Sequence, residues 1–242
     1  MLVPVLVAML SAHAVQQGAP TSSKETAVRT LPARVLRDAG HLANRQPLFA
    51  IAAGGALAAL AHPEDRRIVD RFTPEAAVEE ALDPGSIAGN FATQGGTALA
   101  LYAIGLASRH HGLAELGSEL VEAQALNGIL TETVKVSVDR TRPNGGHLSF
   151  PSGHTSASFA TADVFEQRFG WKIGLLAYAG AAYVSLSRLG EHAHYPSDTL
   201  FGAAVGIASA RSVGAQHRAR RVKGFTIVPV ATRGGAAILL TR

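Results

Sequence analysis

The 242-residue sequence contains no cysteine and comparatively little charge. Without cysteine the chain can form no disulfide bonds, zinc fingers or iron–sulfur sites, and it cannot use a thiol as a nucleophile. Charged residues make up 17% of the sequence, whereas about 25% is usual for soluble domains. The hydrophobic fraction of 47% is ordinary, so a folded core is expected and disorder is excluded as the main state. A net charge of +4 is too small to indicate nucleic acid binding, but it suits an anionic substrate or surface.

Long uncharged stretches are also rare in this sequence. The runs Leu48–Ala61, Ile173–Ser187 and Thr199–Ala210 are uncharged, but they fall short of the about 20 residues that a membrane-spanning helix needs. The stretch Pro84–Ser108 is long enough but carries several polar side chains, and Leu113–Val138 carries several glutamates. Each charge near the middle of a bilayer costs about 2.5–3.5 kcal/mol. We therefore expect a soluble globule with very apolar central helices rather than a membrane-spanning bundle.

Residues 1–14 resemble a secretory signal peptide. An apolar run is followed by Ala12-His13-Ala14, the small-x-small pattern of a cleavage site, and then by polar residues. No lysine or arginine precedes the apolar run, so a buried N-terminal helix is the alternative. The signal-peptide interpretation predicts a periplasmic or secreted protein, where a chain without cysteine avoids unwanted oxidation.

Apolar side chains at three- and four-residue spacing predict an all-α fold, a compact bundle of about six main helices. Proline, glycine and polar clusters mark where these helices begin and end. A linker is expected over Pro63–Pro74, with a short surface helix over Pro74–Leu82 that stops at Asp83-Pro84-Gly85. A short amphipathic helix is expected within residues 20–43. The main helices are expected at Pro47–Ala61, Asn90–Ser108, Leu113–Val138, Gly153–Phe169, Lys172–Arg188 and Pro196–Val213.

The C-terminal residues have a different pattern, with two β-prone runs around Arg233-Gly234-Gly235. They predict a small C-terminal β-hairpin, so the chain divides into a signal peptide (1–14), a helical domain (15–223) and a hairpin extension (224–242). A lone hairpin is marginal in water, so it is expected to pack on the helices or to pair with another copy in an oligomer. The basic stretch between Arg211 and Lys223 is either a solvated helix end or a peripheral contact with an anionic membrane.

Three short strings concentrate the polar residues of the second half of the chain. They supply three cations, two histidines, a carboxylate and a helix start that contains glycine. Free amides at such a helix start bind anions, and a tetrahedral phosphate needs donors for its oxygens, a nucleophile and a proton donor. The strings are Lys135-Val-Ser-Val-Asp-Arg-Thr-Arg142-Pro143, then Pro151-Ser152-Gly153-His154, and Ser187-Arg188 followed after five residues by His194 and after three more by Asp198.

These strings resemble the signature K-x6-RP, PSGH and SR-x5-H-x3-D of the type-2 phosphatidic acid phosphatase superfamily. That superfamily includes bacterial non-specific acid phosphatases, lipid phosphate phosphatases and vanadium haloperoxidases. The resemblance implies that His194 is the nucleophile, that Asp198 orients it, and that His154 protonates the leaving oxygen and later activates water. It further implies that the phosphate oxygens are held by Lys135, Arg142, Ser152, Gly153 and Arg188.

The resemblance predicts a phosphatase that forms a phosphohistidine intermediate without a metal or cofactor. Its substrate is a phosphorylated small molecule or a lipid phosphate or diphosphate. The segment Asn144–Phe150 is short for the acid phosphatase form, which weakens the inference on substrate class. Vanadate is expected to inhibit such an enzyme. The alternatives are a haloperoxidase with vanadate as its prosthetic group, and a non-catalytic envelope protein that binds lipid phosphates.

The sequence does not assign a role to four further polar residues that lie within or beside the strings. The sequence Glu191-His192-Ala193-His194 also fits a metal-binding pair of histidines, although no further ligand spacing lies nearby. Arg140, Asp139 and His147 flank the predicted site, and they either support its residues from behind or lie at its rim.

Overall fold

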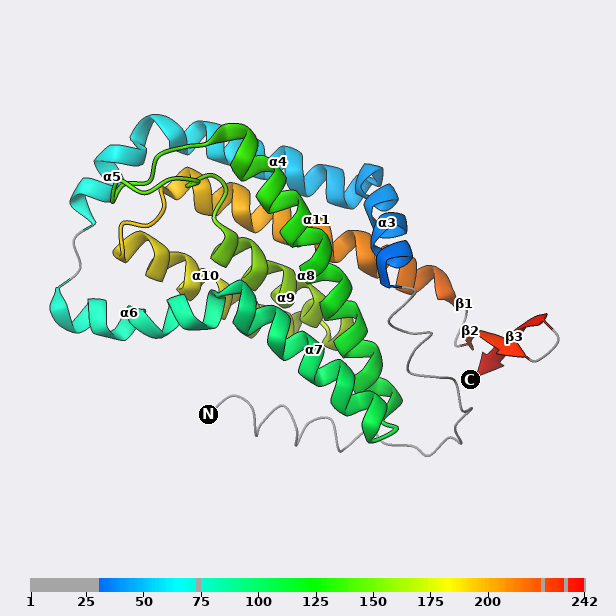
Figure 1. Cartoon of the computed structure of the whole chain (residues 1–242). Coiled ribbons are helices and arrows are strands. Elements are labelled where there is room, and N and C mark those ends of the chain that lie inside the picture. The colour runs from blue at the N-terminus through cyan, green and yellow to red at the C-terminus, as the bar shows by residue number, and fades with distance from the viewer. Residues whose placement is uncertain (1–30, 73–74, 223–224, 233–234, 242) are drawn as a thin grey trace.

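The computed structural model describes residues 31–72, 75–222, 225–232 and 235–241 of the chain (Figure 1). Within these ranges the fold is built of α-helices, two short 3-10 helices and a small antiparallel sheet with the strand order β1-β2-β3. The elements are α3 (Leu31–Gly40), η1 (His41–Ala43), α4 (Arg45–Ala61), η2 (His62–Glu64), α5 (Asp65–Arg71), α6 (Ala76–Gly89), α7 (Phe91–Ala107), α8 (His111–Val138), α9 (Gly153–Phe169), α10 (Trp171–Gly190), α11 (Pro196–Arg220), β1 (Arg221–Val222), β2 (Phe225–Thr232) and β3 (Gly235–Thr241).

The helical character of the fold is confirmed. Most main helices begin and end close to where the sequence predicts, but α11 continues past the expected end at Val213 to Arg220. The Asn90 side chain accepts a hydrogen bond from the Ala92 amide and caps α7, and Ser152 caps α9 in the same way through Thr155. The helix α8 ends at Asp139, which adopts a left-handed conformation. Short polar side chains therefore cap the starts of α7 and α9, as their capping preference predicts.

The predicted fold of about six main helices and a C-terminal hairpin was nevertheless wrong in two respects. Residues expected to form a linker fold into η2 and α5, and α6 continues through Pro84 to Gly89 instead of stopping there. At the other end, β1 follows α11 directly and pairs with β2, so these residues form a three-stranded sheet in place of a hairpin. A two-residue strand such as β1 is too short for a hydrophobic pattern to reveal.

The structure leaves other predictions untested. Residues 1–14, where a signal peptide is expected, lie outside the described residues. The division into three parts and the oligomer that the hairpin suggested stay predictions. Among the helices of the described ranges, none is both long and apolar enough to cross a bilayer.

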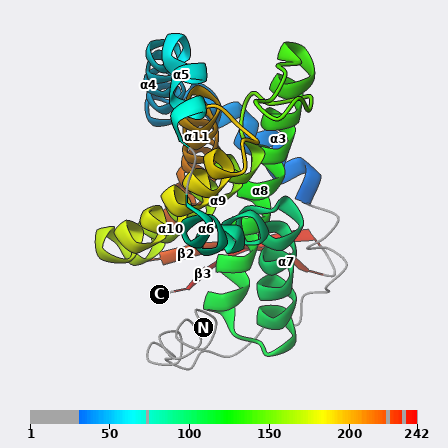
Figure 2. The same cartoon turned by 90° about the vertical axis from the view of Figure 1, so that its left-hand side faces the viewer.

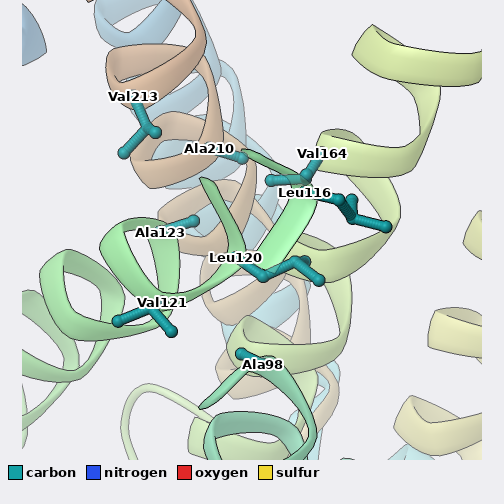
Figure 3. Packing of buried hydrophobic residues seen from close by; sticks show 8 residues of the cluster. All are labelled: Ala98, Leu116, Leu120, Val121, Ala123, Val164, Ala210 and Val213. Atoms are coloured by element: carbon teal, nitrogen blue, oxygen red, sulfur yellow. The ribbon is translucent and has the colours of Figure 1, made fainter. Parts of the chain in front are cut away.

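Three helices, α8, α9 and α11, pack against one another and form the centre of the bundle (Figures 1 and 2). The helix α7 lies against α8, α4 against α11, and α10 against α9. Small and branched side chains from the central helices, joined by Ala98 of α7, form a buried apolar cluster (Figure 3). Full burial of one such leucine or valine contributes about 1.5–3 kcal/mol. The members of the cluster are Ala98, Leu116, Leu120, Val121, Ala123, Val164, Ala210 and Val213.

Two glycines allow α11 to approach α9 closely. A Cβ atom at Gly202 would lie 2.7 Å from the Ser152 carbonyl oxygen, and one at Gly206 would lie 2.2 Å from the Ser156 carbonyl oxygen. Both distances are far below contact distance, so the two backbones pack at a spacing that only glycine permits. Asp198 lies on α11 and His154 on α9. The close spacing of these two helices therefore also sets the distance between these two predicted site residues.

We predict that Gly206→Ala lowers the free energy of unfolding by about 1–3 kcal/mol, because the added methyl group forces backbone shifts in a packed interface. Urea denaturation measures the change. Gly180→Ala is the matched control, since a Cβ at this exposed position of α10 meets no atom within 4 Å. Alanine is the better helix former by about 0.5–1 kcal/mol, so the control is expected to be as stable as the parent chain or more so. Equal stability of the two variants would contradict this interpretation of the interface.

Candidate functional site

The three polar strings meet at one end of the bundle, where α8 and α10 end and α9 and α11 begin. The segment after α8 runs past α5 before it returns to start α9 (Figure 1). It is held in place by backbone hydrogen bonds from Ser149 to the Arg140 carbonyl at 2.8 Å and from Asn144 to the His192 carbonyl at 3.0 Å. These bonds join the loop both to itself and to the segment that carries His194.

His194 and Asp198 form a buried pair at the start of α11. Their side chains are 2% and 0% exposed, and His194 Nδ1 lies 3.6 Å from Asp198 Oδ2. That separation is slightly longer than a hydrogen bond. Contacts of catalytic groups are often long in a free enzyme and shorten when the substrate binds. The Asp198 carboxylate therefore faces Nδ1 of the His194 ring.

Several donors hold the Asp198 carboxylate in its charged form. Its Oδ2 atom accepts hydrogen bonds from the Tyr195 amide at 2.8 Å and from the Ser149 hydroxyl, and its Oδ1 atom accepts one from Arg140 at 2.6 Å. Burial alone would raise the pKa of Asp198, but contacts with His194, these donors and the Arg140 charge outweigh it and lower the pKa. A charged carboxylate orients an imidazole that has its proton on the nitrogen facing it.

Burial lowers the pKa of His194, and the charges of Lys135 and Arg142 lower it further, although Asp198 opposes both effects. The ring is therefore neutral near pH 7. With its proton on Nδ1, opposite Asp198, the ring has its lone pair on Nε2. A neutral imidazole in this tautomer is a nucleophile.

His154 lies in the first turn of α9, within the same field of positive charge. Burial, followed by the charges of Arg188, His194, Arg142 and Lys135, lowers its pKa to about 4. These electrostatic couplings show that the structure brings both histidines and all three predicted cations into one cluster. An anion bound among the cations would offset their charge and raise the pKa of His154.

Each of the three cations donates one hydrogen bond to its surroundings. Lys135 Nζ donates to the Leu148 carbonyl at 2.6 Å, Arg142 Nε to the His147 carbonyl at 2.9 Å, and Arg188 Nη1 to Glu191 at 2.7 Å. A lysine has three N–H donors and an arginine has five. The side chains are therefore fixed in position while further donors remain for the oxygens of an anion.

Ser152 and Gly153 lie at the start of α9, beside the cations. The Ser152 hydroxyl accepts from the Thr155 amide at 3.4 Å and its amide donates to the Asp198 carbonyl at 3.0 Å, so both groups serve the fold. A Cβ at Gly153 would lie 3.7 Å from Lys135 Cε, which places its backbone beside this cation. Amides in the first turn of a helix have no partner within the helix, so those of Gly153 and His154 can bind an anion.

The loops around the cluster contain three non-glycine residues with a left-handed backbone. Asp139, Leu148 and His192 have φ angles of 41°, 57° and 50°. This region suits aspartate better than leucine, and such a conformation costs of the order of 1–3 kcal/mol at a residue that does not favour it. Leu148 is also the residue whose carbonyl accepts the hydrogen bond from Lys135. Local strain therefore accompanies the placement of a site cation.

The structure also resolves some roles that the sequence left open. Arg140 contacts Asp198 directly, so it supports the site from behind. Asp139 and His147 are 64% and 77% exposed and lie 3.8 Å apart, at the rim. His192 Nδ1 lies 3.1 Å from the Gly190 carbonyl oxygen, and the described residues contain no group of three histidine, cysteine or acidic side chains that could hold a metal ion.

Sequence reasoning missed Ser149, Ser197 and Asp65. Ser149 donates to Asp198 from the short loop that was noted only for its length. Asp65 contacts Arg140 and Ser197 from α5, within the segment expected to be a linker. A single aspartate 75 residues before Arg140 has no sequence pattern that could link it to the strings.

Comparisons with known proteins agree with the motif. Residues 117–221 match the sequence model of the PAP2 superfamily. A lipid A 1-phosphatase of Porphyromonas gingivalis is 40% identical over 87 residues, which is 34% of this chain and 20% of that protein. The chain thus spans about a fifth of the length of the curated relative that it matches.

Two solved structures share the fold. The crystal structure of Aquifex aeolicus LpxE superposes with a TM-score of 0.52 at 20% identity and covers 62% of this chain and 92% of that one. The first transmembrane PAP2 type phosphatidylglycerolphosphate phosphatase from Bacillus subtilis gives a TM-score of 0.52 at 16% identity, over 79% of this chain and 96% of that one. The motif and the clustered side chains agree with the match over residues 117–221, and this part of the chain is identified as a domain of the type-2 phosphatidic acid phosphatase superfamily.

Proposed function

We propose that this chain hydrolyses the phosphate ester of a lipid through a phosphohistidine intermediate. The observation that carries the proposal is the placement of a buried His194–Asp198 pair and of His154 within one cluster of cations. A protein that only binds lipid phosphates needs the cations. It does not need a carboxylate that faces one histidine, nor a second histidine beside the same cations.

The chemistry proceeds in two displacements. The Nε2 lone pair of His194 attacks phosphorus, the bond to the leaving oxygen breaks, and that oxygen takes its electron pair and a proton from His154. The neutral His154 then accepts a proton from water, whose oxygen attacks phosphorus while the phosphorus–nitrogen electrons return to His194. The products are an alcohol and inorganic phosphate, and Asp198 stabilises the positive ring of the intermediate.

The three predicted cations supply the charge that the phosphoryl group requires. Lys135, Arg142 and Arg188 come from two helix ends and one loop, so they can surround a tetrahedral group on different sides. Because they are fixed before substrate binds, little reorganisation is needed in the transition state. The proposed reaction therefore needs neither a metal ion nor an organic cofactor.

Two features of the surface favour a lipid as substrate. An apolar groove of about 570 Å³ adjoins the phosphate side of the site, with Gly153 at its edge and Phe91, Gly128 and Ile129 in its wall. Large apolar side chains also lie exposed on the outer helices, among them Phe49, Leu60, Trp171 and Leu176, at 69–77% exposure. Exposed apolar surface of this extent is typical of contact with a membrane or partner. The lipid A 1-phosphatase relative points to the same substrate class.

We predict that the purified chain, in the presence of EDTA, hydrolyses a long-chain lipid monophosphate such as phosphatidic acid with a higher kcat/KM than a nucleotide monophosphate. The reason is that the groove beside Gly153 can bind the acyl chain. Release of inorganic phosphate from detergent-dispersed substrate measures both rates. Equal rates on the two substrates would indicate a non-specific acid phosphatase. Bromide oxidation with vanadate and peroxide would instead indicate a haloperoxidase.

His194→Ala is expected to reduce turnover by at least about 10³-fold, because it removes the nucleophile of a unit whose members act together. His111→Ala is the control, since this exposed histidine lies at the opposite end of α8. It is expected to retain full activity. Full activity of His194→Ala would contradict the proposed chemistry.

The protonation of His154 offers a separate prediction. Its pKa is about 4 in the free protein, and a bound phosphate or vanadate offsets the surrounding cations and raises it. Anion binding should then take up a proton at pH values above 4. NMR titration of labelled histidine, assigned with His154→Asn, measures the pKa with and without vanadate. We expect an increase of at least about one unit; an unchanged pKa would show that the anion does not bind among these cations.

A further inference from the structure

Behind the His194–Asp198 pair, Arg140 bridges two buried carboxylates. Its Nη1 atom lies 2.6 Å from Asp198 Oδ1, and its Nη2 atom lies 2.8 Å from Asp65 Oδ2. The two carboxylate side chains are 0% and 2% exposed. The guanidinium also lies over the Tyr195 ring, 4.1 Å from its centroid, which fixes its plane. One guanidinium therefore bridges two carboxylates that water does not reach, and the exposed His62 places its Nδ1 atom 3.2 Å from Asp65 Oδ2 on the outer side.

Asp65 also holds the first turn of α11. Its Oδ1 atom accepts a hydrogen bond from the Ser197 amide at 2.9 Å, and its Oδ2 atom accepts one from the Ser197 hydroxyl. Arg140 Nη1 donates to the same Ser197 hydroxyl at 2.8 Å. Ser197 directly precedes Asp198. Asp65 is therefore connected to Asp198 in two ways, through the backbone of α11 and through Arg140.

The charges of Arg140 and Asp65 determine how strongly the negative charge of Asp198 stabilises a positive charge on the His194 ring. Arg140 alone, at 2.6 Å, would cancel much of the negative field that Asp198 exerts on the imidazole. Asp65 offsets the charge of Arg140, so the group of three carries one net negative charge next to His194. In a buried setting such charge differences have large effects, because the effective dielectric constant is low.

We propose that Asp65 is a positioning residue for the His194 nucleophile, acting through Arg140 and Ser197 on Asp198. This inference rests on the proposed function of His194. Asp65 lies outside residues 117–221, which match the family model, and it reaches the site from α5. It fixes the orientation of Asp198, and its charge stabilises the positive ring that forms when His194 carries the phosphoryl group.

The test is Asp65→Asn, which keeps an oxygen for the Ser197 amide but removes the charge. We expect kcat to fall about 10–100-fold, the size of loss found when the hydrogen-bonding partner of a metal-bound side chain is removed. The KM for phosphatidic acid and inhibition by vanadate are expected to change by less than about threefold, because the phosphate-binding cations are untouched. Asp70→Asn, on the exposed side of the same helix, is the control and should behave like the parent chain.

A second variant separates a charge effect from a loss of structure. Arg140→Gln removes the cation that Asp65 offsets, so the double variant Asp65→Asn/Arg140→Gln should recover part of the activity that Asp65→Asn loses. NMR titration should give a His194 pKa that is lower in Asp65→Asn than in the parent chain and is raised again in the double variant. Such non-additivity is the sign of direct coupling between neighbours.

Two outcomes would overturn the proposal. In the first, Asp65→Asn has the same activity and the same His194 titration as the parent chain. In the second, the fraction of Asp65→Asn that is unfolded accounts for its whole loss of activity. The histidine titration needs no turnover. If the parent chain fails to hydrolyse any phosphate ester, the proposed function fails, while the titration still decides whether Asp65 acts on His194.

Discussion

The carboxylate of Asp198 is the point at which separate parts of the chain meet. The loop after α8 contacts it through Ser149 and Arg140, the Tyr195 amide donates to it from just before α11, and His194 faces it across 3.6 Å. A buried carboxylate without donors would be costly to the folded state or would take up a proton. The path of the loop, the start of α11 and the orientation of the histidine therefore depend on one another.

This dependence extends to the helices that carry the site. The Ser152 amide donates to the Asp198 carbonyl, which ties the start of α9 to the first turn of α11. Gly202 and Gly206 allow the two helices to stay close beyond that point. His154 and His194 are thus held in fixed positions, where burial and then the surrounding positive charge lower the pKa of His154 to about 4. The bundle supplies the rigidity that holds three cations together before an anion arrives.

Much of the site could be predicted because its residues lie in three short strings with fixed spacing. Periodicity predicted the main helices, and the structure places every predicted site residue at one end of them. The Ser152 amide is used by the fold, since it donates to the Asp198 carbonyl, whereas the hydroxyl accepts from the Thr155 amide and keeps its own O–H as a donor. Asp65 could not be found in the sequence, because its relation to Arg140 exists only after α5 has packed beside α11.

The central claim is that the phosphoryl group passes through His194. Phosphorus NMR or mass spectrometry of the protein, quenched in alkali during turnover of a lipid phosphate, tests it most directly. Alkaline conditions are chosen because phosphohistidine is labile in acid. The account predicts a phosphorus–nitrogen bond on His194 that forms and disappears at a rate consistent with turnover, and that is missing from His194→Ala. A phosphoryl group on another residue, or turnover without any covalent phosphorus, would contradict it.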